Sequence, residues 1–122
     1  MINMKDEGLY RYSANVTSVY DADTCTVDID LGLGIWLRKQ KLRFFGINAP
    51  EMRGPERPQG ILARDFCRQL IDKKRIIIQT LDDGKGKYGR LLAILWLEYP
   101  ENEWININEL LVEQGHAIAK DY

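Results

Sequence analysis

Five polar residues, at or near the ends of predicted strands, could together act on a phosphate ester: Asp23, Arg43, Asn48, Glu51 and Arg90. Carboxylate and amide oxygens are ligands that hard cations such as Ca²⁺ and Mg²⁺ prefer, with room for a backbone carbonyl and water. Guanidinium groups and a cation neutralise the charge that gathers on the phosphorus oxygens during hydrolysis. A further carboxylate can take a proton from the attacking water. This combination suits a metal-dependent phosphodiesterase.

The same residues also have simple structural interpretations. Asp23 could cap a turn, and Arg43 could form a structural salt bridge. Glu51 could be a surface acid, and Arg90 could only clamp the glycine-rich loop before it. His116, the single histidine, has no orienting partner nearby in the sequence and is interpreted as a packing or surface residue. One histidine and two cysteines do not make a convincing zinc site.

The segment 42–51 must position several of these side chains. Arg43 interrupts an otherwise apolar run of a strand buried on both faces, formed by Leu42, Phe44, Phe45 and Ile47. Because a guanidinium group cannot lose its charge, Arg43 should have an anionic partner. Pro50 fixes its own φ and keeps the residue before it extended, so residues 48–51 should form a stiff turn.

The segment 23–31 alternates strictly between two faces. Asp23 shares its side of the strand with Cys25, Val27, Ile29 and Leu31. The Asp23 carboxylate should therefore point inward at the rim of the sheet, whereas Asp28 and Asp30 on the other side should be solvated. Cys25 lies in an apolar strand pattern and Cys67 in a helical one, which favours two buried thiols over a disulfide.

The order of the elements indicates an α+β domain dominated by β structure. Strands are predicted over 9–20, 23–31, 42–47, 76–80 and 91–97, the first three as a meander with a glycine-containing turn at 31–34. A helix over 60–72, with apolar positions at Leu62, Ala63, Phe66, Cys67, Leu70 and Ile71, separates strands 3 and 4. Asn106 and Glu109 form a capping box for a C-terminal helix that ends at Gly115, and 82–90 is a polar loop. We expect one domain over 1–122, a five-stranded OB-type Greek-key barrel.

The net charge of −1 conceals a segregation of charges. Residues 38–75 carry eleven basic and four acidic side chains, whereas both ends of the chain are acidic. This pattern indicates either a localised anion-binding face or a solvated helix with scattered arginines. Because the sequence has no apolar run of about 20 residues and no signal peptide pattern, we expect a cytoplasmic protein without a membrane span.

Several motifs together resemble the staphylococcal nuclease (thermonuclease) family, in family order and over about residues 10 to 120. They are Asp21-Ala22-Asp23-Thr24, Arg43 followed by Ile47-Asn48-Ala49-Pro50-Glu51, Lys87-Tyr88-Gly89-Arg90, and the segment 108–115. The resemblance implies an OB-fold, Ca²⁺-dependent phosphodiesterase that acts on DNA and RNA, with other divalent cations as alternatives. We also expect a monomer.

The resemblance also assigns metal ligands. Asp23 would bind the cation directly, together with the amide of Asn48 and the backbone carbonyl of Ala49, while Asp21 would bind it through water. Asn48 departs from the aspartate that is usual in the family, and the loss of one negative charge should weaken metal binding.

The remaining roles follow in the same way. Glu51 falls on the proposed general base, Arg43 and Arg90 on the arginines that grip the scissile phosphate, and Lys87 and Tyr88 on contacts to the neighbouring phosphate and sugar. Two alternatives stay open. The chain could be a nucleic-acid-binding barrel that has lost hydrolysis, which Asn48 favours, or a protein-interaction barrel that uses the same rim.

Overall fold

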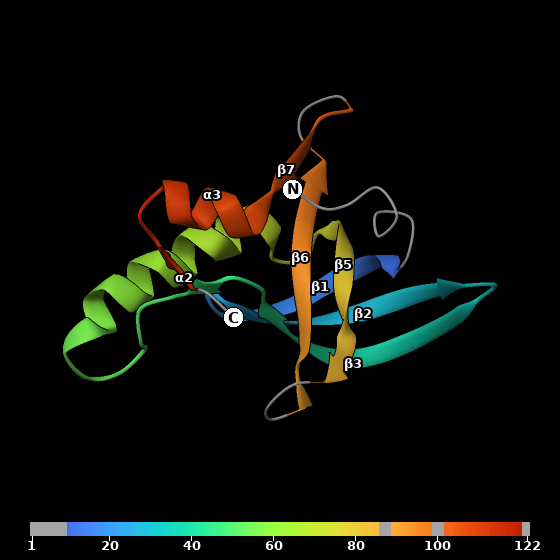
Figure 1. The fold of residues 1–122 in the computed structure, drawn as a ribbon, viewed down its shortest axis with the longest axis horizontal. Helices are drawn as coiled ribbons and strands as arrows, with labels where there is room; N and C mark the ends of the chain where they lie inside the picture. The colour runs from blue at the N-terminus through green and yellow to red at the C-terminus, as the bar shows by residue number, and fades with distance from the viewer. Residues whose placement is uncertain (1–9, 86–88, 99–101, 121–122) are drawn as a thin grey trace.

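Five strands close into a barrel, as predicted (Figure 1). The computed structural model describes residues 10–85, 89–98 and 102–120, and the side chains of all of these except 82–85. The strands are β1 (Arg11–Asp21), β2 (Thr24–Gly32), β3 (Ile35–Phe44), β5 (Arg75–Lys85) and β6 (Leu91–Glu98). Their order is β3-β2-β1-β5-β6 with antiparallel neighbours, and a parallel pairing of β3 with β6 closes the barrel.

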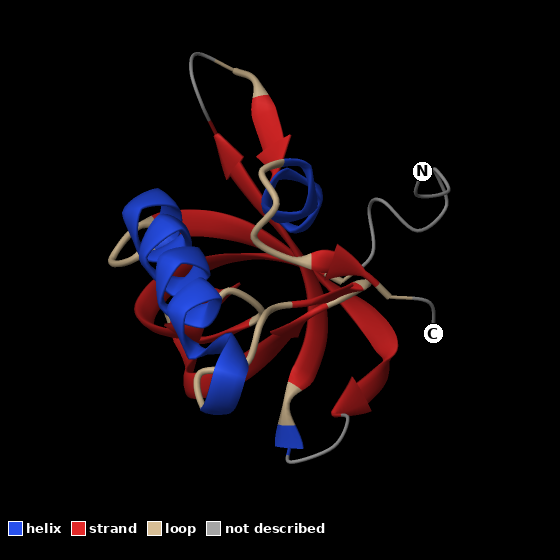
Figure 2. Ribbon diagram, turned by 90° about the vertical axis from the view of Figure 1, so that its left-hand side faces the viewer, coloured by secondary structure: helices blue, strands red, loops and turns tan. Residues whose placement is uncertain are grey.

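Two helices cover one side of this barrel (Figures 1 and 2). A 3₁₀ turn, η1 (Gly54–Glu56), leads into α2 (Arg57–Ile71), which connects β3 and β4 to β5. The short strand β7 (Trp104–Asn106) pairs with the end of β6 and precedes α3 (Ile107–Glu113). The predicted cap of α3 is confirmed, since the Asn106 side chain accepts from the Glu109 N–H at 3.0 Å.

The core is built from alternate residues of the strands, as their period of two requires. Cys25, Val27 and Ile29 of β2 are buried as predicted, and α2 adds Cys67 and other small or aliphatic side chains. Both cysteines are free, buried thiols. Burial raises the pKa of Cys25 well above its usual value and that of Cys67 to about 12, so both stay protonated at neutral pH.

A two-stranded pair lies beside the barrel and was absent from the sequence-based prediction. Gly46, with a φ of +81°, turns the chain after β3 into β4 (Ile47–Asn48), which pairs with β8 (Ile118–Ala119). The strand predicted over 42–47 therefore ends at Phe44, and Ile47 belongs to a different pairing. The pairing of β4 with β8 therefore holds the backbone of Asn48 in place.

Two further boundaries correct the prediction. The helix starts at Arg57 rather than Gly60, so it includes Pro58 in its first turn. A proline is tolerated there because the backbone N–H groups of the first turn have no partner within the helix, and the missing N–H of proline therefore costs no hydrogen bond. Strand β5 continues to Lys85, four residues into the predicted 82–90 loop, because backbone pairing with β6 requires no apolar side chain.

Two leucines expected on buried faces are exposed. Leu62 is 64% exposed because the helix turns Gly60, Ala63 and Cys67 toward the barrel instead. Leu31 is 44% exposed because the β2–β3 hairpin projects beyond the barrel (Figure 1). No helix in the described part of the chain is long and apolar enough to cross a membrane.

Candidate functional site

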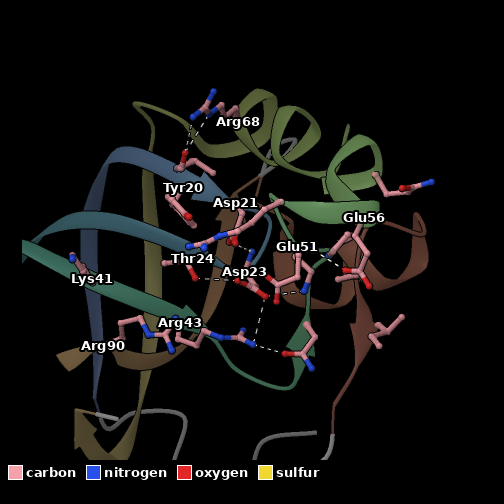
Figure 3. A pocket seen from close by; sticks show the side chains of 18 of the residues that line it. Tyr20, Asp21, Asp23, Thr24, Lys41, Arg43, Glu51, Glu56, Arg68 and Arg90 are labelled. Carbon is pink, nitrogen blue, oxygen red and sulfur yellow. Dashed lines mark hydrogen bonds and ion pairs between the residues drawn. The ribbon is translucent and has the colours of Figure 1, made fainter. Parts of the chain in front are cut away.

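A cleft of about 1440 Å³ opens at the rim of the barrel, between strands β1–β3, the turn after β4, and α2 (Figure 3). All seven described residues of the predicted site line it, namely Asp21, Asp23, Arg43, Asn48, Ala49, Glu51 and Arg90. The other two predicted site residues, Lys87 and Tyr88, lie outside the described residues. The structure thus brings together side chains that are up to about 70 positions apart in the sequence.

Asp23 connects the start of β2 to the turn that follows β4. It is only 8% exposed, and its Oδ2 accepts a 2.7 Å hydrogen bond from the Ala49 N–H. Its Oδ1 accepts from the Thr24 hydroxyl at 3.0 Å. The predicted inward orientation at the rim is therefore confirmed, and the stiff turn at Pro50 is fastened directly to this carboxylate.

Arg43 has the anionic partner that its position in the strand predicts. Its Nη2 lies 3.5 Å from Asp23 Oδ2 and also donates to the amide oxygen of Asn48. Its Nη1 donates to the carbonyls of Phe44 and Ile47 at 3.0 and 2.9 Å. Because the loop that follows β3 wraps around the guanidinium group, Arg43 is fixed at the floor of the cleft.

Asp21 and Asp23 form a carboxylate pair beside Arg43. The Asp23 N–H donates to Asp21 Oδ1 at 3.0 Å. Burial raises the pKa of Asp21 to about 7, and the adjacent Asp23 adds to this rise, while the charge of Arg43 opposes it only in part. A cation placed between the two carboxylates would relieve both effects.

This donor set fits a hard divalent cation. No group of three or more His, Cys, Asp or Glu side chains is arranged to hold a metal among the residues that the structure describes. The predicted set instead combines Asp21 and Asp23 with two neutral oxygens, the amide of Asn48 and the carbonyl of Ala49. An all-oxygen set of this kind suits Ca²⁺ rather than Zn²⁺.

Glu51 lies on the exposed wall of the cleft, and the position of its turn depends on Gly60 of α2. The Glu51 N–H donates to Glu56 Oε1 at 2.8 Å. A Cβ atom at Gly60 would lie 2.4 Å from the Glu51 carbonyl oxygen, so only glycine lets α2 approach this turn so closely. Gly60 is not among the site residues predicted from the sequence, although a glycine inside a helical pattern is a signal of close packing.

Arg90 reaches the cleft through the closure of the barrel. The parallel pairing of Leu42 with Leu91 places the start of β6 next to the strand that carries Arg43. His116 remains outside the cleft lining, and its ring packs on Phe66 with centroids 4.5 Å apart, as the packing interpretation predicts. The structure therefore gathers the predicted arginines, carboxylates and amide at one rim, which Arg53, Arg68 and Glu56 also line.

The closed five-stranded barrel with a cleft at its rim places the protein in the class of OB-type folds. Comparison with known sequences gives the family. The sequence model of the family "Staphylococcal nuclease homologue" matches residues 41–122. The chain is 33% identical to the thermonuclease of Staphylococcus hyicus over 110 residues, which are 88% of this chain and 59% of that protein. It is 31% identical to the thermonuclease of Staphylococcus intermedius over the same shares of both chains.

The chain belongs to the staphylococcal nuclease homologue family. It spans about three fifths of the length of these curated relatives.

Proposed function

We propose that the protein is a Ca²⁺-dependent phosphodiesterase that hydrolyses DNA or RNA. The observation that supports this most directly is the convergence of Arg43, Arg90, Glu51 and the Asp21–Asp23 pair at one open cleft. Relatives that are called thermonucleases support the same activity. A structural salt bridge alone would need neither a second arginine nor a third carboxylate at the same place.

In this proposal Asp23, Asn48 and the carbonyl of Ala49 hold the cation directly, and Asp21 holds it through water. The bound cation would supply positive charge to the phosphate oxygens. Arg43 and Arg90 bind the non-bridging oxygens, and Arg43 is already fixed by two carbonyls of its own loop. A fixed donor costs no reorganisation when charge develops during the reaction.

Glu51 accepts a proton from the attacking water in the proposed mechanism. It lies on the exposed side of the cleft, where water reaches it freely, whereas Asp23 is already occupied by hydrogen bonds from Thr24 and Ala49. The buried Asp23 and the exposed Glu51 thus have different roles in the proposal. One binds the cation, and the other exchanges protons.

Cleavage assays with single-stranded DNA and RNA test the proposal, in Ca²⁺ and with a chelator as the control. We expect Arg90→Ala to lower kcat by roughly 100-fold to 1,000-fold while the melting temperature changes little, because one preorganised charge donor is worth about that much. Arg64→Ala, which removes an arginine of α2 outside the cleft, is the matched control and should keep full activity. Near wild-type cleavage by Arg90→Ala would contradict the assigned role.

A second candidate is a nucleic-acid-binding barrel without hydrolysis. The observation in its favour is Asn48, whose neutral amide oxygen already accepts from Arg43. Retention of oligonucleotide on the protein in Ca²⁺ without any cleavage would support this candidate. Failure to bind nucleic acid would support a protein-interaction barrel instead.

A further inference from the structure

The cleft continues past the proposed site along the outer face of β1, β2 and β3. Asp21, Thr24 and Arg43 are paired across these strands and form the row that faces the site. The next row is Ser18, Thr26 and Lys41, and it also lines the cleft. Along β2 and β3 the two rows are two residues apart, which is about 7 Å in an extended strand. This separation is comparable with that of neighbouring phosphates in a polynucleotide.

Lys41 offers a charge at this second row. Its side chain is exposed, and no hydrogen bond or ion pair joins its ammonium group to any residue that the structure describes. Arg38, Arg64 and Arg75, by contrast, each pair with a carboxylate. Lys41 is therefore a cation in the cleft that no described residue neutralises.

Tyr20 offers an aromatic surface beside the same row. Val19 pairs with Cys25 and Asp21 pairs with Thr24, so Tyr20 is the extra residue of a β-bulge. Such bulges are common next to active sites, where they redirect a side chain. The Tyr20 side chain lines the cleft and is 62% exposed, which leaves the ring free to stack on a base. Figure 3 shows Lys41 on the side of the cleft away from Glu51 and Glu56.

We propose that Lys41 and Tyr20 form a second nucleotide subsite for single-stranded polynucleotides. Lys41 binds the phosphate next to the one held at Arg43, and Tyr20 stacks on the base between these two phosphates. The substrate must be single-stranded at this point, since a base inside a duplex stacks on its neighbours and cannot reach Tyr20. The assignment rests on the proposed function only in placing the scissile phosphate at Arg43.

Binding is measured first, by fluorescence anisotropy with a labelled oligothymidylate in chelator. Lys41→Gln should reduce the slope of log Kd against log salt by about 0.7, the value for one lost contact to single strands. Lys74→Gln makes the same charge change outside the cleft and should leave the slope unchanged. Tyr20→Leu should weaken binding about tenfold and Tyr20→Phe should not, because the ring rather than the hydroxyl stacks. An abasic oligomer should abolish the effect of Tyr20→Leu and preserve that of Lys41→Gln.

Cleavage of short substrates in Ca²⁺ then isolates Lys41. Adding a second phosphate, from the thymidine dinucleotide to the trinucleotide, should raise kcat/KM in the wild type and not in Lys41→Gln. Equal gains in both proteins, with an unchanged salt slope, would overturn the subsite while leaving the proposed hydrolysis intact. If the wild type binds with the expected Lys41 and Tyr20 effects but cleaves nothing, the subsite stands and the nuclease proposal fails. Absence of binding in chelator together with absence of cleavage in Ca²⁺ would overturn both.

Discussion

Asp21 is the residue whose environment should be visible in stability measurements. Its pKa is about 7 in the native protein, well above the usual value of 3.8, so between these values the native state binds more protons than the unfolded state. The contribution of Asp21 to the free energy of unfolding must therefore fall as the pH rises from about 4 to about 7, and stay low above that.

Urea unfolding in chelator checks this prediction. The stability of Asp21→Asn relative to the wild type should increase over the same pH range, because the amide never ionises. The comparison between the two proteins cancels the titration of carboxylates that do not interact with Asp21. A constant difference from pH about 4 to about 8 would contradict the raised pKa.

Asn48 determines the charge of the metal site. Substitution to aspartate adds a third carboxylate near the Asp21–Asp23 pair, so Asn48→Asp should bind Ca²⁺ roughly tenfold more tightly, since ligand charge is what tunes such sites. Without Ca²⁺ the same substitution should lower the melting temperature through repulsion between carboxylates. Calorimetric titration and thermal melts measure both, with Asn48→Ala as the variant that should weaken binding. Unchanged affinity in Asn48→Asp would place the cation elsewhere.

At the scale of the elements, α2 positions Glu51 through Gly60. Alanine is the better helix former by about 1 kcal/mol, so Gly60→Ala would be stabilising if the helix alone mattered. Its Cβ would instead meet the Glu51 carbonyl at 2.4 Å, and the turn must move. We expect Gly60→Ala to lower both the melting temperature and the rate of cleavage.

Gln69→Ala, on the exposed side of the same helix, is the control for Gly60→Ala and should affect neither property. A Gly60→Ala protein that is more stable and fully active would show that the turn relaxes without consequence. Crystallographic comparison of the two proteins would then show whether Glu51 moves.

The elements also show what a sequence can predict. The alternation of β2 correctly placed Cys25, Val27 and Ile29 inside, because a period of two is a local property of the backbone. The β4–β8 pair was missed because its two residues on each side are too short to have a pattern of their own. The exposure of Leu31 depends on how far the hairpin projects beyond the barrel, and its own strand pattern carries no information about that distance.

The candidate site was predictable to a similar extent. Residue types and strand ends indicated Asp23, Arg43 and Glu51 as members of one site, because strand ends meet at the rim of a barrel. The positions of Gly60, Tyr20 and Lys41 relative to the cleft depend on helix packing, a bulge and the pairing register. These are contacts between distant segments, which no local pattern in the sequence determines.

At the scale of the whole molecule, the distribution of charge limits how strongly the protein attracts a polyanion. The net charge is −1, so attraction must come from the few cations in the cleft rather than from the overall field. With Arg43, Arg90 and Lys41 each contacting one phosphate, the slope of log Kd against log salt for single-stranded DNA should be about +2. Affinity should then fall roughly 20-fold between about 50 and about 200 mM salt. Anisotropy titrations measure this slope directly. A much steeper slope would mean that further cations, such as Arg53 and Arg68 in the same cleft, also contact the strand. A slope near zero would mean that the cleft does not bind phosphates.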